Sequence, residues 1–481
     1  MTERSPMTGP AATGPSATGP PAADPPATVS RARRWAALAV MLCGTLLANL
    51  DVFIVVVAVP AFSRDLGAGA GQQQMVLAGY QLVYALGLIT GGRLGDMYGI
   101  FRVFAAGMAV FVLASVGCAL APGAAALVAA RLVQGAGTAL LVPQVYNAAR
   151  TLFREREQRA AFAATGAVMG LGAVSGQLLG GWLIGADLFG LGWRSVFWVN
   201  VPVGLAALCA VPFVAVRGGR RRMGLDGAGL LLGALALAAF SVPPAFGRDL
   251  GWPWWIWLCL SLSVPAGAAF AAHERRAQRR DRAPLLPPGL LTGRFPLGLL
   301  LIALFNSGLN AFFLVLGLHL QQGLGWDPMQ AGSAMLPLAG LFAVLSLLVP
   351  RLRKASLKHL LVWGGSVAAL GYAAAAGSAL CRHPLWLLCS LAVVGAGQGL
   401  FITPALTATL RTAPERFTGS ASGVVSTVQQ TAAAVGVCLL GLIYYGAVDS
   451  GTATGTAFAL TSAAIAAVSA AAAALACRLP A

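Results

Sequence analysis

Two charged residues lie deep inside long apolar segments of the chain, where charges are rare. Asp51 is the single acidic residue well within such a segment, and Arg131 is the single basic one. A charge at the centre of a bilayer costs about 2.5–3.5 kcal/mol, so each is a candidate functional residue. A carboxylate at that depth can carry a proton, and a neighbouring arginine can modulate its charge. The alternative interpretation is a fixed ion pair that only joins two helices.

The depths of the two residues favour contact between them. At 1.5 Å per helical residue, Asp51 lies about 16 Å and Arg131 about 12 Å from the outer end of its segment. Both side chains therefore fall in one layer, where they could pair. A proton that crosses with the membrane potential supplies about 2.3 kcal/mol per 100 mV. That energy sustains about a 50-fold substrate gradient per 100 mV, because 1.36 kcal/mol corresponds to a factor of ten.

The composition predicts an all-α membrane protein. Of 481 residues, 58% are hydrophobic and 10% are charged, whereas soluble proteins carry about 25% charged residues. This excludes a soluble enzyme, a disordered protein and a secreted disulfide scaffold. The eight cysteines are scattered singly. We find no cluster of His with Asp or Glu and no nucleotide or hydrolase motif, so we expect no enzyme activity, no cofactor and no metal.

Fourteen segments are long and apolar enough to span a bilayer. They lie near 35–62, 74–92, 100–121, 123–148, 160–185, 195–216, 227–246, 252–272, 297–320, 331–349, 359–380, 384–408, 418–446 and 453–477. If the N-terminus is cytoplasmic, the Lys and Arg residues outside the spans lie on the cytoplasmic side, with four exceptions: Arg64, Arg194, Arg248 and Arg382. This distribution predicts a multi-pass cell-membrane protein with both termini cytoplasmic. It also accounts for the net charge of +17 without a nucleic-acid partner.

The arrangement of the spans suggests four regions. We expect a disordered cytoplasmic tail (1–34), a six-helix half (35–216), two inserted helices with basic cytoplasmic loops (217–294) and a second six-helix half (295–477). Two six-helix halves are typical of transporters that rock around a central site. The substrate site is therefore expected between the halves, near the middle of the membrane.

Four segments carry a family resemblance. Residues 50–60, Leu-Asp-Val-Phe-Ile-Val-Val-Val-Ala-Val-Pro, resemble the helix-1 motif of the fourteen-helix drug:proton antiporters of the major facilitator superfamily, with Val56 where Asn is usual. Residues 92–99, Gly-Arg-Leu-Gly-Asp-Met-Tyr-Gly, resemble the loop 2–3 signature of that superfamily. This second resemblance implies a gating loop, in which Asp96 could cap a helix N-terminus. The candidate gating residues are Gly92, Asp96, Gly99 and Arg102.

Two further motifs lie on the fourth and fifth spans. Residues 127–139 resemble the family's helix-4 motif, which implies a role in proton coupling for Arg131 and its neighbours; the motif residues are Arg131, Gln134, Gly135 and Gly137. Residues 172–181 resemble the helix-5 antiporter motif, with Gln177 in place of the usual Pro. Its candidate residues are Gly172, Gly176, Gly180 and Gly181. Small residues at this spacing form a flat face against a partner helix, although generic helix packing produces the same pattern.

The resemblance covers roughly 35–477 and implies a monomeric antibiotic or multidrug efflux pump of the actinomycete type. Such a pump exports a small amphiphilic compound by alternating access, with Asp51 and Arg131 coupling export to protons. The alternative is a proton-coupled symporter for a nutrient or metabolite on the same fold, which should lack the helix-1 and helix-5 motifs. The absence of a mid-span acid in the second half favours neutral, zwitterionic or anionic substrates.

Several polar residues are candidates for the lining of the substrate cavity. They are Gln81, Tyr84, Asn306, Asn310, Gln398 and Gln429. Asn306 and Asn310 are four residues apart and share one face of a helix. Each amide could instead form a hydrogen bond between helices.

Overall fold

The computed structural model describes residues 30–216, 226–280, 284–349, 356–381, 383–414 and 418–478, without the side chains of residues 155, 156, 418 and 419. Within these ranges, fourteen helical segments are long and apolar enough to cross a membrane. They coincide with the fourteen predicted spans, and no strand occurs among the described residues. The expected fold class, an all-α membrane protein, is confirmed.

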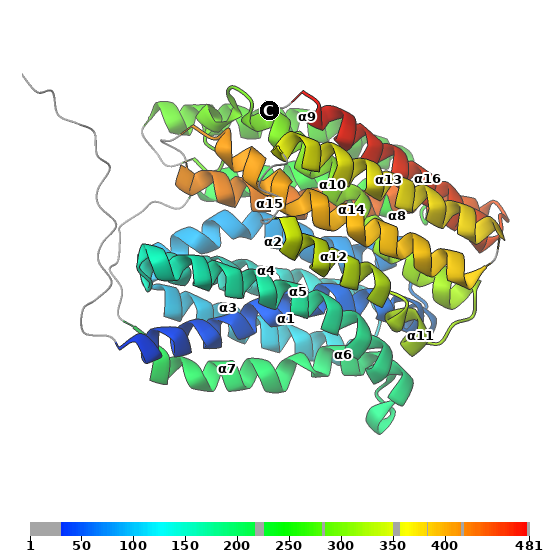
Figure 1. Ribbon diagram of the computed structural model, residues 1–481, viewed down its shortest axis with the longest axis horizontal. Helices are drawn as coiled ribbons and strands as arrows, with labels where there is room; N and C mark the ends of the chain where they lie inside the picture. The colour runs from blue at the N-terminus through cyan, green and yellow to red at the C-terminus, as the bar shows by residue number, and fades with distance from the viewer. Residues whose placement is uncertain are drawn as a thin grey trace, which may run out of the picture.

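The first six spans form one bundle, which occupies the lower half of Figure 1. Its helices are α1 (Arg31–Leu66), α2 (Ala70–Tyr98), α3 (Ile100–Ala119), α4 (Ala124–Thr151), α5 (Glu155–Ala186), α6 (Ser195–Trp198) and α7 (Asn200–Val214). The short α6 and the longer α7 together make the sixth span, Gly192–Val214. We call this bundle the N-terminal half.

The last six spans form a second bundle, coloured yellow-green to red, most of which lies in the upper half of Figure 1. Its helices are α10 (Phe295–Leu318), α11 (Pro328–Ser333), α12 (Leu336–Leu348), α13 (Leu357–Cys381), α14 (Pro384–Arg411), α15 (Thr418–Asp449) and α16 (Thr454–Ala476). α10 continues into a π-helical turn at His319–Gly323, and α11 and α12 share one span. We call this bundle the C-terminal half.

The two remaining spans form a hairpin at the edge of the seam between the halves. α8 (Gly227–Phe246) contacts α2 of the N-terminal half and α15 of the C-terminal half, and α9 (Trp254–Arg279) packs on α8. Only 6% of the most apolar stretch of α9 is buried within the protein. α9 therefore presents most of its apolar surface outward, as expected for a helix that faces lipid.

The start of the first helix differs from the expected tail. Residues 1–29 of the predicted tail lie outside the described residues, but Arg31 to Arg34 already belong to α1. The side chain of Ser30 caps the helix by accepting the backbone N–H of Arg33 at 3.3 Å. Arg34 donates to Glu157 at 3.1 Å and to the carbonyl of Leu152 at 3.0 Å. These contacts keep the basic residues at the start of α1, Arg31, Arg33 and Arg34, within the helix.

Close backbone approach at glycines packs the helices of both halves. In the C-terminal half, a Cβ added to Gly436 on α15 would lie 2.0 Å from the carbonyl oxygen of Ser307 on α10. A Cβ added to Gly446, also on α15, would meet no atom within 4 Å. Glycine is therefore required for packing at the first position and not at the second.

We predict that Gly436→Ala destabilises the protein, whereas Gly446→Ala does not. The extra methyl group at residue 436 must push α15 away from α10, and overpacking of this kind costs about 1–3 kcal/mol. Thermal unfolding of the purified variants in detergent measures the difference. Equal melting temperatures for the two variants would contradict the assigned packing of α15 on α10.

Candidate functional site

Asp51 on α1 and Arg131 on α4 form an ion pair inside the N-terminal half. Nη1 of Arg131 donates directly to Oδ2 of Asp51. The Asp51 side chain is 0% exposed and the Arg131 side chain is 1% exposed. The contact expected from their similar depths is confirmed. Their role in proton coupling remains a prediction.

Two amide side chains complete the surroundings of the Asp51 carboxylate. Nε2 of Gln134 donates to Oδ1 of Asp51 at 2.9 Å, and Nδ2 of Asn200 donates to the same oxygen at 3.0 Å. The same two amides donate to Oγ of Ser115 at 2.9 and 3.4 Å. All of these groups are buried. Both oxygens of the Asp51 carboxylate therefore accept hydrogen bonds from side chains of the N-terminal half.

Sequence reasoning missed Asn200 and Ser115 as members of this network. Asn200 lies at the start of α7 and Ser115 lies near the end of α3. Asn200 is a buried amide at the start of an apolar span, which was a signal available in the sequence. Ser115 offered no such signal, because serines are common in membrane helices.

Arg131 is also held by α2. Its Nε donates to the carbonyl oxygen of Val76 at 2.9 Å, and its guanidinium lies 4.3 Å from the centre of the Tyr80 ring. The hydroxyl of Tyr80 is 2.9 Å from Oγ1 of Thr138. A cation above an aromatic face is attracted to it, most strongly where water is excluded. The arginine therefore connects the acid on α1 to α2.

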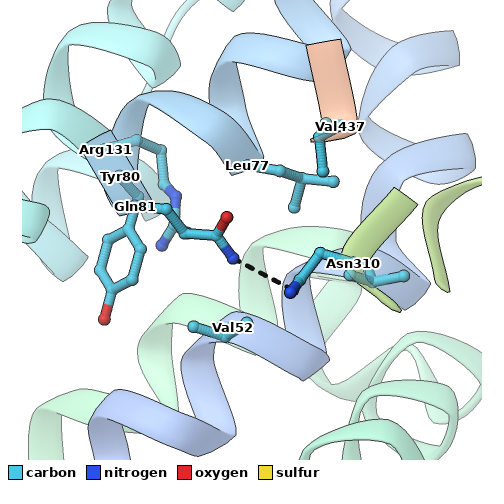
Figure 2. Close-up of a pocket in the computed structure, with 8 residues that line it drawn as sticks. Val52, Leu77, Tyr80, Gln81, Arg131, Asn310 and Val437 are labelled. Atoms are coloured by element: carbon cyan, nitrogen blue, oxygen red, sulfur yellow. Dashed lines mark hydrogen bonds between the residues drawn. The ribbon is translucent and has the colours of Figure 1, made fainter. Parts of the chain in front are cut away.

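A small cavity lies between the two halves beside Arg131 (Figure 2). Its volume is about 10 Å³, which is about the space that one water molecule requires. The lining residues are Val52, Val56, Leu77, Tyr80, Gln81, Arg131, Asn310 and Val437. Nε2 of Gln81 on α2 donates to Oδ1 of Asn310 on α10 at 3.2 Å, and this hydrogen bond joins the two halves across the cavity. The cavity is too small for a drug-sized molecule in this conformation.

The structure separates the predicted cavity residues into two groups. Gln81 and Asn310 line the cavity, and Tyr84 lies one turn from Tyr80 on α2, with ring centres 6.4 Å apart. Three other predicted residues lie elsewhere: Asn306, Gln398 and Gln429. Asn306 donates to the carbonyl of Ile302 in its own helix at 2.9 Å, and Gln398 donates to the hydroxyl of Tyr372 at 3.2 Å. Gln429 is partly buried on α15.

These contacts show how two of the predicted cavity residues are bonded in this conformation, and their place in a substrate cavity stays a prediction. Asn306 and Gln398 do not line this cavity, because each amide is satisfied inside the C-terminal half. They fit the alternative, in which a polar side chain in a membrane helix makes a structural hydrogen bond. Hydropathy and spacing cannot distinguish the two cases, because both require an amide in an apolar segment.

The glycine face of the helix-5 motif packs on the helix that carries Asp51. A Cβ added to Gly172, Gly176 or Gly180 would lie within 3.0 Å of an atom of α1. Gly181 lies on another face of α5, where a Cβ would be 2.4 Å from the carbonyl oxygen of Pro328 on α11. The expected flat face is present, and its partner is α1. α5 therefore contacts the helix of the buried acid on one side and the C-terminal half on the other.

The glycines of the helix-4 motif let α4 pack closely on its neighbours, and this packing positions Arg131. A Cβ on Gly135 would lie 2.4 Å from the carbonyl oxygen of Tyr80 on α2, and a Cβ on Gly137 would lie 2.7 Å from the backbone nitrogen of Phe111 on α3. These close approaches bring α2 and α3 against α4. Arg131 thus meets Val76 and Tyr80 on α2, and the side chain of Gln134 reaches α3.

The predicted gating residues lie where α2 ends and α3 begins. Gly92, Asp96 and Gly99 lie at the end of α2, and Arg102 lies in the first turn of α3. Gly99 has a φ of 97°, so the sharp connection between the two helices favours glycine. Asp96 and Arg102 are exposed, whereas Arg93 is buried and donates to the carbonyl of Pro284. The gating role and the capping by Asp96 remain predictions.

Known proteins with similar sequences are membrane transport proteins and antibiotic resistance proteins. A family profile described as the Major Facilitator Superfamily matches residues 41–222 and 217–437. The chain is 37% identical, over 87% of its length and 74% of the relative, to a protein of Streptomyces coelicolor named as a probable actinorhodin transporter. It is 38% identical, over 86% of its length and 82% of the relative, to a puromycin resistance protein of Streptomyces alboniger.

A third relative and a solved structure extend these similarities. The chain is 34% identical to a cephamycin export protein of Amycolatopsis lactamdurans, over 84% of its length and 83% of the relative. Its fold is similar to a crystal structure of the peptide transporter POT in complex with sulfate, with a TM-score of 0.67 and 18% identity. That similarity covers 92% of this chain and 94% of the other, and it concerns the fold alone.

We predict that Arg131→Met destabilises the protein by about 3–5 kcal/mol, because it leaves the buried Asp51 carboxylate without its cation. The double variant Asp51→Asn with Arg131→Met should be less destabilised than Arg131→Met, since it removes both charges. Equilibrium unfolding in mixed detergent micelles measures these differences in the free energy of unfolding.

The matched control is the exposed pair Arg194–Asp65, whose side chains are 31% and 49% exposed. Arg194→Met should cost about 0–1 kcal/mol, the range typical of exposed ion pairs. Similar losses for Arg131→Met and Arg194→Met would contradict the importance assigned to the buried pair.

Proposed function

The chain belongs to the major facilitator superfamily of membrane transport proteins, and we propose that it exports a small amphiphilic antibiotic in exchange for protons. The observation that carries this proposal is the buried Asp51–Arg131 pair beside a cavity lined by both halves. The names of the relatives refer to the transport or export of antibiotics, or to resistance against them. These names support outward transport and an antibiotic as the substrate.

Asp51 is the proposed proton carrier. Protonation would remove the charge of Asp51 and leave Arg131 buried without its anion, a state that costs several kcal/mol in a water-excluded site. Arg131 lines the cavity, so a new position of its side chain would change the substrate site directly. Protonation would thus destabilise the present conformation relative to one in which Arg131 reaches solvent or substrate.

Alternating access is the proposed transport cycle, and the contacts between the halves suggest which state this structure represents. Tyr445 on α15 donates to Oε1 of Gln73 on α2 at 2.6 Å, and α5 touches α11 at Gly181 and Pro328. With both termini in the cytoplasm of a cell membrane, these contacts lie at the outer side. This conformation would then be closed to the outside.

Two other hydrogen bonds between the halves, among the described residues, are longer. The bond from Arg150 to Ser422, near the cytoplasmic ends of α4 and α15, is 3.3 Å, and the bond from Thr427 on α15 to the carbonyl of Ala85, midway along α2, is 3.4 Å. Long hydrogen bonds are weak, so the halves would separate more easily here. We infer that substrate enters from the cytoplasm at this end.

The substrate is proposed to be neutral, zwitterionic or anionic. The cavity offers two amides, a tyrosine ring and the Arg131 guanidinium, and its other lining residues are apolar. Asp51 lies next to the cavity, but its carboxylate is occupied by Arg131, Gln134 and Asn200. A compound with two positive charges would find no free carboxylate among these residues.

We predict that Asp51→Asn abolishes proton-driven export but keeps substrate exchange. An amide cannot take up and release a proton, whereas exchange of labelled for unlabelled substrate needs no net proton movement. The measurement uses inverted vesicles with an imposed pH gradient. The probe is the compound against which the expressed wild-type protein protects best in a panel that includes puromycin.

Asp65→Asn is the matched control, because Asp65 lies at the exposed end of the same helix and pairs with Arg194. This control should keep proton-driven export. Unchanged proton-driven export in Asp51→Asn would reject Asp51 as the carrier. Loss of both export and exchange in that variant would reject the division of roles between the acid and the cavity.

We also predict that Asn310→Ala lowers the resistance conferred to a sensitive host at least several-fold, because it removes the hydrogen bond to Gln81 across the cavity. Asn306→Ala is the control on the same helix, since the Asn306 amide is bonded to its own backbone. Minimum inhibitory concentrations at matched expression measure the effect. Equal losses for the two variants would argue against a substrate site at this cavity.

A further inference from the structure

A second group of chemically capable side chains lies on the inserted hairpin, away from the cavity between the halves. Asp226 precedes α8, and His273 and Glu274 lie near the end of α9. One ligand atom from each of the three residues lies within 4.8 Å of the other two. The sequence expectation that no His clusters with Asp or Glu is therefore wrong. The hairpin joins residues that are 47 positions apart.

Hydrogen bonds occupy three of the four carboxylate oxygens of the cluster. Oδ1 of Asp226 accepts the backbone N–H of Gly229 at 2.8 Å, and Oε2 of Glu274 accepts the backbone N–H of Leu286 at 2.8 Å. Nε2 of His273 lies 2.9 and 3.1 Å from the two Asp226 oxygens. Oε1 of Glu274 is the one carboxylate oxygen of the cluster without a hydrogen-bond partner among the described residues.

Glu274 Oε1 is the atom that points to a missing ligand. The residue is 2% exposed, and Oε1 has no hydrogen-bond partner among the described residues. A Cβ built on Gly229 would lie 2.8 Å from Oε1 and 2.6 Å from Oδ2 of Asp226, so both oxygens face the same small space above this glycine. An unsatisfied buried acceptor costs about 1–3 kcal/mol, and more when it is charged.

The neighbouring Arg93 makes no hydrogen bond to Oε1 of Glu274. Arg93, at the end of α2, directs its Nη2 to the carbonyl oxygen of Pro284, and its Nη1 has no hydrogen-bond partner among the described residues. Two carboxylates and one imidazole therefore converge without a direct ion pair to this arginine. A ligand of charge +2 would balance the two acids.

We propose that Asp226, His273 and Glu274 form a binding site for a divalent transition-metal cation, with Zn²⁺ as the representative ion. Imidazole and carboxylate are ordinary ligands of zinc, at about 2.0–2.2 Å, and three protein ligands leave one tetrahedral position for water. Mg²⁺ and Ca²⁺ prefer sites built from oxygen alone, so His273 selects against them. The three ligand atoms lie within 4.8 Å of one another, and the cation would replace the hydrogen bond between His273 and Asp226.

A cation at this site would join three parts of the chain. It would connect the start of α8 to the end of α9, and through Glu274 it would hold the segment at Leu286 that leads to α10. The carbonyl of Pro284 in that segment accepts the hydrogen bond from Arg93 of the predicted gating loop. None of the three residues lines the cavity, so binding of the cation can be measured without transport.

The test measures Zn²⁺ binding to the purified full chain in detergent, after removal of any histidine tag and treatment with a chelator. We expect one saturable site per chain by isothermal titration calorimetry and by elemental analysis, and no comparable binding of Mg²⁺. Asp226→Asn, His273→Gln and Glu274→Gln should each weaken binding at least tenfold, by analogy with the effect of altering groups around known metal sites. Asn still caps a helix N-terminus, so Asp226→Asn leaves the start of α8 intact.

Two control variants should keep the site. His383→Ala removes an exposed histidine and Cys209→Ser removes an exposed thiol, and neither belongs to the cluster. Size-exclusion profiles establish that each variant is folded. If Glu274→Gln does not fold, His273→Gln decides the question. Absence of saturable binding to the wild type, or binding that survives in every folded cluster variant, would overturn the proposal.

Discussion

The ion pair between Asp51 and Arg131 constrains the rest of the N-terminal half. Two charges without solvent are tolerated only when they neutralise each other and when hydrogen bonds satisfy their remaining polar atoms. The structure meets this condition with Gln134 from the helix of the arginine, Asn200 from α7 and a backbone carbonyl of α2. Four helices must therefore hold a fixed mutual register. The glycines of α4 and α5 make that register possible, because they bring backbones close to α1, α2 and α3.

This arrangement also limits how a proton could act on a substrate. The acid lies inside one half rather than on the seam, and only Arg131 of the pair lines the cavity between the halves. Any effect of the charge of Asp51 on the cavity must therefore pass through the arginine or through movement of α1. α5 provides a second physical connection, because it packs on α1 through its glycine face and on α11 through Gly181. α1 also reaches the seam itself, because Val52 and Val56 line the cavity and Gln321 of the C-terminal half donates to the carbonyl of Val57.

The sequence predicts most of the fold, because a bilayer imposes a minimum length and apolarity on every span. It also predicts the pairing of Asp51 with Arg131, because depth follows from residue number at a fixed rise. It does not predict which amide faces the cavity. Gln398 and Asn310 look alike in sequence, and only the rotation of each helix in its bundle separates a structural hydrogen bond from a cavity group. The group Asp226, His273 and Glu274 was invisible for a related reason, since hairpin geometry brings distant residues together.

The inserted hairpin bears on the proposed movement of the two halves, because α8 contacts both of them. At one end, Asp249 accepts the backbone N–H of Gly71 in the N-terminal half, and Arg248 pairs with Asp449 in the C-terminal half. Asp449 is 62% exposed, and exposed pairs contribute only about 0–1 kcal/mol. At the other end, the contact of Glu274 with the segment leading to α10 is buried. The hairpin is therefore tied by a buried contact to the segment that leads into α10, whereas its contact with Asp449 of the C-terminal half, at the opposite end, is a partly exposed ion pair.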